Sequence, residues 1–434
     1  MNTHPCDAGL ASVASSGSEK MIYDIRMGPQ GISHEGSYYV AYQAAARGGY
    51  AHPYVTRRSP DGRWSRPVRA GKVAESDHHL GPVIWLDDHL HFHILYNCHF
   101  SLNRSRHRVS TRPLDISCWK NALPIAPSIS YPRVVSFPDG RRLLYYRALG
   151  HMGYRTYRVS PDGRHWNVPA DPLVDFDRDP LIPGDEWSGS YHTVARDRQG
   201  LCVHIAFVRW DERNRVNPLY RRFVNLWSRY DLYYARLDIS SGTLFNIRGE
   251  PLPRPLNRRV ARQRCLVWET GEHLTNMPSI LIDRHDRPQF CLPVAGDQLD
   301  ECRFWFIRRE GDAWKRYPVT DTDNIWNGSH LEYGKDGSIA VFLIGRATGH
   351  GELPYGGGTL EEWRSDDGGR RWHKVRTIAL PRGFLANNPK PVEDRHGNIL
   401  PRTLLFFGWK GPRPIPAQGP FSGKAFLWRD GQWL

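Results

Sequence analysis

The stretch YPRVVSFPDGRRLLYYR, residues 131–147, decides the fold class of this 434-residue chain. It holds one apolar run, a turn of Pro, Asp and Gly, and a second run rich in Leu and Tyr. Two runs of β-prone residues that flank a tight turn predict an antiparallel hairpin. The hairpin opens on an aromatic polar residue, Tyr131.

The same unit recurs along the chain. Its other copies are residues 32–43, 77–96, 191–210, 276–296, 329–346 and 388–407. The turn residues Gly36, Asp88, Gly140, Gly200, Asp286, Gly337 and Gly397 follow one another at spacings of 52, 52, 60, 86, 51 and 60 residues. Such a period, with paired strands in each repeat, is typical of a β-propeller.

The repeat therefore predicts an all-β fold, a seven-bladed β-propeller of four-stranded antiparallel blades. We expect residues 21–434 to form this single domain and residues 1–20 to be disordered or loosely attached. The spacing of 86 predicts an insertion around residues 214–229 or 248–264. An eighth blade there would lack the repeat pattern.

The composition agrees with a globular β-rich protein. The chain has 16 Trp, 20 Tyr, 40 Gly and 33 Pro but only 5 Met, and 40% of its residues are hydrophobic. No apolar run approaches the roughly 20 residues that a membrane-spanning helix needs. The formal charge of +14 is spread along the chain and suits an anionic substrate, although charge alone does not exclude nucleic acid.

A second periodic mark is a turn followed by tryptophan. It reads SDDGGRRW at residues 365–372, SPDGRHW at 160–166 and SPDGRW at 59–64. Asp and Gly build the tight turn and Trp packs behind it, so the motif closes a hairpin between outer strands. It is the Asp-box of neuraminidase-type repeats, and we expect it to be structural.

Candidate site residues come from the start of each repeat, because the innermost strands of a propeller line its central channel. These openers are His78, His79, Tyr131, Arg133, Tyr191, His192, Asn276, His330, Asn388 and Lys390. Among them, His192, Asn276, His330 and Lys390 are predicted substrate contacts, as is Arg147 at a strand end.

Two hairpins carry the predicted chemistry. His79 and His99 bracket the first, 20 residues apart, so paired strands would return His99 to the end at which His79 starts. Tyr191 and Arg209 lie at neighbouring ends of a later hairpin, where both side chains could point into one mouth. A single His, Tyr or Arg in such a place is often structural.

Histidine, tyrosine and arginine together suit β-elimination at a uronic acid. The C5 proton becomes acidic once a cation neutralises the neighbouring carboxylate, and the planar fork of Arg matches that carboxylate. A neutral His or an ionised Tyr can take the proton, and Tyr or His can protonate the leaving oxygen. The predicted catalytic residues are His79, His99, Tyr191 and Arg209, with the base and acid unassigned.

The segments DHHLGPV around His79 and YNCHFS around His99, with the Tyr191…Arg209 hairpin, resemble the BNR-repeat polysaccharide lyases. These are seven-bladed propellers that include ulvan lyases and rhamnose–glucuronate lyases. The resemblance implies that His79 and His99 take the paired-histidine places, Tyr191 the tyrosine place and Arg209 the carboxylate-neutralising place. It also implies no cofactor for the chemistry, with a structural calcium or zinc ion as an open question.

Two other functions compete with this interpretation. An Asp-box glycoside hydrolase of the sialidase type needs acidic residues, and the openers are mostly His, Tyr, Asn and Lys. A carbohydrate-binding propeller without catalysis is the other. We expect an anionic polysaccharide or oligosaccharide as partner, no nucleic acid, no membrane, and a monomer. The first 20 residues lack a basic start and an apolar core, which predicts a cytoplasmic protein or a trimmed secreted one.

Overall fold

The computed structural model confirms the all-β prediction. It describes residues 12–14, 21–45, 50–73, 75, 77–99, 102, 104–150, 153–168, 171–176, 187–212, 216–224, 228–347, 355–410 and 423–434. In these residues the strands β1–β31 are accompanied by one 3-10 helix, η1 (His78–Leu80), and one α-helix, α1 (Arg258–Arg264). Within the described ranges, neither helix has the length and apolar content needed to cross a membrane.

The chain divides into two compact units, which we describe separately. Unit 1 holds residues 1–150, 158–169 and 378–434, and unit 2 holds residues 151–157 and 170–377. The single domain over residues 21–434 therefore stays a prediction. Of the N-terminal segment 1–20, only strand β1 (Ser12–Ala14) is described, and it pairs with β30; the rest of that prediction lies outside the described residues.

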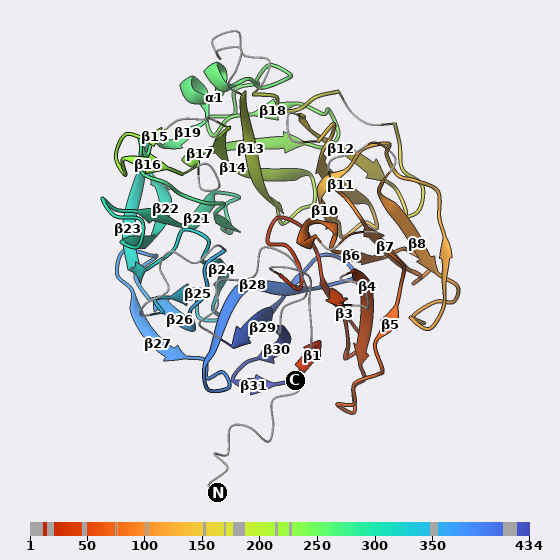
Figure 1. Cartoon of the computed structure of the whole chain (residues 1–434). Coiled ribbons are helices and arrows are strands. Elements are labelled where there is room, and N and C mark those ends of the chain that lie inside the picture. Colours follow the sequence, from red (N-terminus) through yellow and green to blue (C-terminus); the bar gives the residue numbers. More distant parts are fainter. Residues whose placement is uncertain are drawn as a thin grey trace, which may run out of the picture. The chain divides into compact units, whose positions relative to one another are not determined.

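Unit 1 joins the two ends of the described chain in one sheet. Its strands run in the order β1, β30 (Gly423–Arg429), β29 (Ile399–Lys410), β28 (Phe384–Asp394), β2 (Gly31–His34), β3 (Ser37–Ala45), β4 (Ala51–Arg58) and β5 (Val68–Arg69), with β31 (Gln432–Trp433) on β30. Every pair in this sheet is antiparallel except β2 with β28. Strands β2 and β28 lie side by side although they stand at opposite ends of the sequence. Figure 1 shows β28, in blue, near β3, in orange-red.

Two more sheets follow in chain order. One has four strands, β6 (Val83–Leu86), β7 (Phe92–Tyr96), β8 (Arg106–Ser110) and β9 (Trp119–Asn121). The other has three, β10 (Ser130–Ser136), β11 (Arg142–Arg147) and β12 (Arg155–Ser160). All side chains of β7 and β11 are buried, as expected of strands that are covered on both faces.

The segment before β2 ties β6 to β10. The backbone N–H of Ile84 donates to the Pro29 carbonyl over 3.0 Å, and that of Gly28 donates to the Pro132 carbonyl over 3.1 Å. A side chain at Gly28 would require the Arg133 guanidinium to move. The arrangement brings residues 24–26, 77–79 and 131 together.

Unit 2 contains three larger sheets and a short hairpin. The first sheet is β13 (Trp187–Arg196), β14 (Cys202–Glu212), β17 (Arg229–Asp238) and β18 (Leu244–Phe245), with β19 (Leu266–Trp268) on β17. The second sheet consists of β20 (Ser279–Ile282), β21 (Pro288–Ala295), β22 (Cys302–Glu310) and β23 (Ala313–Thr322). The third consists of β24 (Ser329–Tyr333), β25 (Ile339–Gly345), β26 (Thr359–Ser365) and β27 (His373–Thr377). The hairpin of β15 (Val216–Asn217) and β16 (Arg222–Phe223), together with α1, occupies the two regions where an insertion was predicted.

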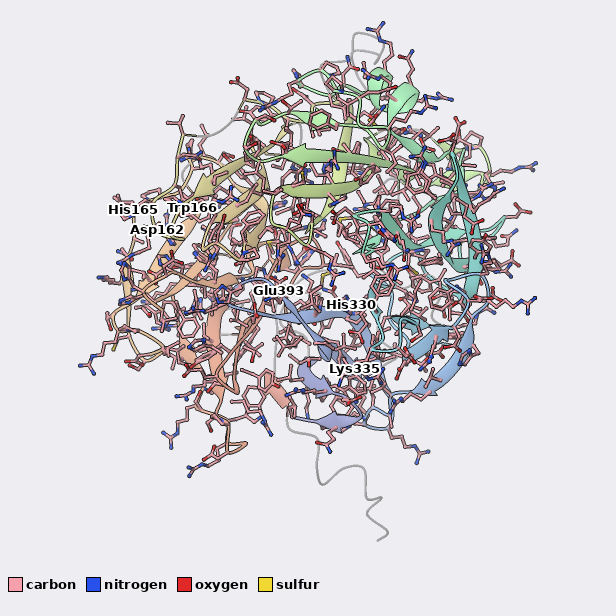
Figure 2. The ribbon with its side chains drawn as sticks, turned by 180° about the vertical axis from the view of Figure 1, so that it is seen from behind. Asp162, His165, Trp166, His330, Lys335 and Glu393 are labelled. Atoms are coloured by element: carbon pink, nitrogen blue, oxygen red, sulfur yellow. The ribbon has the colours of Figure 1, made fainter. Side chains whose placement is uncertain are left out.

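The Asp-boxes have the predicted structural form. In unit 1 the Ser160 hydroxyl accepts from the Gly163 backbone N–H at 2.8 Å, and Asp162 accepts from the backbone N–H groups of Arg164 and His165. Figure 2 shows Asp162 and Trp166 close together at this turn. The box at residues 365–372 closes with the same hydrogen bonds in unit 2. None of these groups is placed for acid–base chemistry, because each is used by the turn.

Candidate active site in unit 1

The candidate site begins at the short helix η1. Asp77 is its N-cap: the side chain accepts the backbone N–H of His79 at 3.0 Å, as expected for an aspartate at this position. The same carboxylate contacts two imidazoles, His79 Nδ1 at 2.6 Å and His99 Nδ1 at 3.6 Å. One carboxylate therefore orients both rings.

His79 and His99 are brought together as the hairpin predicted. Their rings stack with centroids 4.1 Å apart and an interplanar angle of 12°. His79 is the more accessible of the two, with 17% of its side chain exposed against 1% for His99. His78 lies beside them, with its ring centroid 3.8 Å from that of His79. The pair is thus a preformed group that presents His79 outward.

Tyr131 completes the group from the start of β10. Its hydroxyl is 3.1 Å from His99 Nε2, and its ring contacts two guanidinium groups, with Arg26 Cζ and Arg147 Cζ each 4.6 Å from the centroid. Tyr131 has a φ of +54°, in the region that favours glycine, at a register shift between Ser130 and Arg133. Strained, bulged backbone that re-aims one side chain is typical of functional sites.

Arg26 is held by its own carboxylate. Asp24 Oδ1 accepts from Arg26 Nε at 2.8 Å, and Asp24 Oδ2 is 2.5 Å from the Arg26 terminal nitrogen. The same guanidinium lies 3.2 Å from His78 Nε2 and 3.4 Å from the Tyr131 hydroxyl. A guanidinium can only donate, so His78 Nε2 is the acceptor and His78 is neutral in this contact. Arg26 thus connects Asp24, His78 and Tyr131.

The histidines of this group are neutral at pH 7. Burial lowers the pKa of both His79 and His99, to about 4 in each case, and Asp77 only partly offsets this effect. Burial alone would raise the pKa of Asp77, but the neighbouring histidines hold it far below its usual value. Arg26 does the same to the pKa of Asp24. The site therefore combines neutral imidazoles with ionised carboxylates.

We expect this group to make the protein acid-sensitive. The unfolded chain protonates His99 at its ordinary pKa near 6.5, whereas the folded chain does so only near 4. The free energy of unfolding should therefore fall between about pH 6.5 and 4, by up to about 3 kcal/mol for this histidine. Urea denaturation at pH 7 and 4.5 would measure it. The fall should be smaller in His99→Gln and unchanged in His165→Gln, an exposed control; equal falls in all three would contradict the prediction.

Two sets of side chains offer atoms at metal-binding separations. They are Asp24, His78 and His79, and Asp77, His79 and His99, each with its ligand atoms within 4.8 Å of one another. A cation in the first set would face the Arg26 guanidinium, which already occupies the Asp24 carboxylate. The second set shares His79 with the first. These residues fit acid–base chemistry better than a resident metal ion, because a buried guanidinium repels a cation.

The other predicted catalytic pair, Tyr191 and Arg209, does not converge. Strands β13 and β14 pair without a shift, Ser190 opposite Arg209 and Tyr191 opposite Val208. Alternate side chains point to opposite faces, so Tyr191 and Arg209 leave the sheet on different sides. The prediction that both side chains point into one mouth of the channel is therefore wrong. The residue opposite Arg209 is Ser190, one position before Tyr191. Their separate catalytic roles stay predictions.

On their two faces, Tyr191 and Arg209 have different partners. The Arg229 guanidinium lies 4.5 Å from the Tyr191 ring centroid and 4.4 Å from that of Trp326. Arg209 pairs with two carboxylates, Asp211 and Asp231. Burial alone would lower the pKa of Arg209, but these carboxylates raise it above its usual value. Arg209 is thus already neutralised by acids of its own sheet.

The predicted substrate contacts are divided between the two units. Arg147 lies over Tyr131 in unit 1. Lys390, also in unit 1, is buried and donates to the Asp24 carbonyl at 2.6 Å, to the Met27 carbonyl and to Gln30 Oε1 at 2.9 Å. Burial lowers the pKa of Lys390 well below its usual value. This lysine braces the backbone beneath Arg26, so its position favours a structural role.

The remaining three predicted contacts are buried in unit 2. His192 Nε2 lies 2.7 Å from the Ser190 hydroxyl, and its ring stacks on Phe207. Asn276 accepts the backbone N–H of the next residue at 2.9 Å. His330 has a carboxylate partner 3.8 Å away, Glu332. Their contact with substrate stays a prediction.

Three residues of the unit 1 group were given no role from the sequence. Tyr131 is a repeat opener, and the YYR end of the strand that follows it is the sequence signal that could have indicated its role. Asp77 was visible only as part of the DHH triplet. Arg26 precedes the first complete repeat and no periodic signal marks it, because its position depends on the contact between residues 28–29 and strands β6 and β10.

Comparisons with known proteins agree with this picture. The family described as "BNR repeat-containing family member" matches residues 30–322, which is more than half of the chain. The chain belongs to the BNR repeat-containing family. A protein named "Ulvan Lyase-PL25" from Pseudoalteromonas sp. (strain PLSV) is 28% identical over 397 residues, 81% of this chain and 74% of that protein. An "Ulvan lyase" from Nonlabens ulvanivorans is 25% identical over 425 residues, 88% of this chain and 86% of that protein.

Solved structures show the same fold. One described as "Structure of a new family of Polysaccharide lyase PL25-Ulvanlyase" matches with a TM-score of 0.78 and 20% identity, over 97% of this chain and 96% of that one. A second structure described in the same way is bound to "-[GlcA(1-4)Rha3S]-" and matches equally well. The resemblance predicted from the sequence is confirmed: this BNR-repeat chain is related to polysaccharide lyases, and its relatives support an enzyme of that class.

Proposed function

We propose that this chain cleaves an acidic, uronate-containing polysaccharide by β-elimination in the site of unit 1. The observation that carries the proposal is the pair of neutral histidines on one carboxylate, next to a tyrosine whose hydroxyl contacts His99 and whose ring contacts two guanidinium groups. The group supplies a base, an acid and cationic charge within one small volume. The reaction needs no cofactor, because these residues provide every proton transfer.

Neutralisation of the uronate is the first requirement. We assign it to Arg147, whose planar fork suits a carboxylate and whose guanidinium lies over the Tyr131 ring. Arg26 is less suited because Asp24 already occupies it. Charge neutralisation at the carboxylate stabilises the enolate-like state that forms when the C5 proton leaves.

His79 is the proposed base. Its Nδ1 faces Asp77 at 2.6 Å, which leaves Nε2 to accept the C5 proton, and its ring is the most accessible of the pair. The imidazolium that results is stabilised by the ionised Asp77. Because the pKa of His79 is lowered to about 4, the neutral form that can accept a proton dominates at neutral pH.

Tyr131 is the proposed acid. The C5–H bond breaks with its proton going to His79, the electron pair forms the C4–C5 double bond, and the C4–O4 bond breaks as O4 takes the Tyr131 proton. The resulting tyrosinate is stabilised by the two guanidinium groups that contact its ring, and His99 orients the hydroxyl. The proton on His79 restores Tyr131 through solvent before the next cycle. The catalytic roles predicted for Tyr191 and Arg209, which lie in unit 2, stay predictions.

The function is tested by the product. Incubation with ulvan, gum arabic, glycosaminoglycans and bacterial exopolysaccharides should release an unsaturated uronate from at least one polymer, seen as rising ultraviolet absorbance. New reducing ends without this absorbance would establish hydrolysis and refute the elimination. Binding to one polymer without any cleavage would support the recognition propeller.

The geometry favours elimination over hydrolysis of the sialidase type. A retaining hydrolase needs two carboxyl groups that act as nucleophile and acid. In the site of unit 1, Asp24 is paired with Arg26 and Asp77 with two histidines, so both carboxylates already have positioning tasks.

We also propose that the fold is a seven-bladed β-propeller and that the protein is a monomer. The supporting strand groups are β2–β5, β6–β9, β10–β12, β13 with β14, β17 and β18, then β20–β23, β24–β27 and β28–β31. A crystal structure would test the number of blades, and light scattering would test the monomer.

A further inference from the structure

A hollow of about 520 Å³ lies in unit 1 at the first residues of β28, outside the site described above. Its lining combines three cations, Arg382, Lys410 and Lys424, with two aromatic rings, Phe384 and Phe426. The three cationic residues are exposed, Phe384 is half-buried and Phe426 is buried.

The register of the sheet explains why these side chains gather. Phe384 pairs with Lys410, and Lys424 pairs with Gly408, so all four positions share one face of β28, β29 and β30. Gly408 has no side chain between Phe384 and Lys424, and a Cβ there would meet the Leu385 carbonyl at 2.8 Å. The glycine thus leaves the middle of the face open.

The cations of the hollow are not paired with acids. Among the described residues, no ion pair involves Arg382, Lys410 or Lys424, although Arg402 of the same sheet pairs with Asp430 at 2.6 Å. Lys424 lies over the Phe384 ring at 5.8 Å, and that ring contacts Phe426 edge to face at 6.2 Å. Like charges around one hollow repel one another, and an anion bound between them would relieve this repulsion.

Strand β28 connects the hollow to the candidate active site. Asn388 is four positions after Phe384, roughly 13 Å along a strand. The Asn388 carbonyl accepts from the Tyr23 hydroxyl at 3.0 Å, and the next residue along the chain from Tyr23 is Asp24, the partner of Arg26. Residues 386–388 are buried, so a polymer bound at the histidine pair that passes over this part of β28 would place a later sugar over the hollow.

We propose that this hollow is a distal subsite for an anionic sugar of the polymer. The lysines and Arg382 bind its carboxylate or sulfate group, and the rings of Phe384 and Phe426 contact its apolar face. The inference rests on the proposed function, since it assigns a second contact to the same substrate. The subsite should increase the affinity for long polymer chains and leave the rate of the chemical step unchanged.

The test is the double variant Lys410→Ala/Lys424→Ala on a polymer that the wild type cleaves. We expect KM for the polymer to rise roughly three- to tenfold, as for the loss of two exposed charge contacts, with kcat unchanged. KM for a short oligosaccharide should not change. Lys410→Arg/Lys424→Arg should keep the wild-type KM, and Lys120→Ala/Lys335→Ala, which removes two exposed lysines elsewhere, should do the same.

Three results would overturn the subsite: an unchanged polymer KM, a fall in kcat alone, or an equal effect in the Lys120→Ala/Lys335→Ala control. If the wild type cleaves no polymer, the proposed function fails and calorimetric binding of ulvan decides the subsite separately. Weaker binding in the double variant supports it, and equal binding refutes it. Desulfated ulvan distinguishes the ligand group, because a difference that persists with it indicates the carboxylate and one that disappears indicates the sulfate.

Discussion

Replacing His79 by alanine should lower kcat/KM for polymer cleavage by about 10²- to 10⁴-fold, the usual contribution of a positioned general base. The variant lacks the imidazole whose Nδ1 is held by Asp77 at 2.6 Å, and no other neutral imidazole of the group is as accessible. Initial rates of ultraviolet absorbance on the cleaved polymer would measure the loss. The wild-type rate should rise with pH through about 4, because His79 must lose its proton before it can act as base.

His165→Ala is the matched control for this change. That histidine is exposed, belongs to the Asp-box of residues 160–166 in the same unit and pairs with Asp162 at 2.6 Å. Its variant should keep the wild-type rate. If His79→Ala retained more than a tenth of the wild-type kcat/KM, His79 would not be the base, and the same measurement on His99→Ala would show whether its neighbour acts instead.

Tyr131→Phe should lower kcat by about 10²- to 10⁴-fold with little change in KM. The change removes only the hydroxyl that lies 3.1 Å from His99 Nε2, while the ring stays in contact with Arg26 and Arg147. Loss of the buried contacts of this hydroxyl with His99 and Arg26 should cost about 1–3 kcal/mol of stability, so the variant should fold. Steady-state kinetics and thermal unfolding on the same preparation separate the two effects.

Tyr42→Phe offers a control with the same chemical change in the same unit. The Tyr42 ring is buried and stacks on Tyr54, with no contact to the histidine pair. Its kcat should equal that of the wild type. A Tyr131→Phe enzyme of normal kcat would remove Tyr131 from the mechanism and leave Tyr191 as the predicted tyrosine.

The part of the site that depends on local periodicity could be predicted from the sequence. The all-β fold, the Asp-box turns and the return of His99 to His79 all follow from hairpins, in which strand length and turn position decide what meets what. Arg147 was placed near a substrate for the same reason, as the last residue of a strand that follows Tyr131 by one hairpin. These features lie within stretches of about 20 residues.

The register of β13 and β14 could not be predicted from the sequence. A sequence can indicate that two strands pair, but a shift of one residue exchanges the faces of the sheet. Tyr191 and Arg209 lie at neighbouring strand ends, yet Ser190 is the residue opposite Arg209. The predicted pair therefore separates, and Arg209 meets Asp211 and Asp231 instead.

By itself, the sequence determined the repeat, the β-rich fold and the two histidines, because alternation and turn chemistry are local properties of the chain. Only the tertiary structure decided that the Tyr131 ring contacts both Arg26 and Arg147 and that Asp77 is shared by both imidazoles. Those contacts join residues up to 105 positions apart and depend on how three strand starts pack together. Burial in that packing also lowers the pKa of His79 and His99, and the extent of burial cannot be predicted from the sequence pattern.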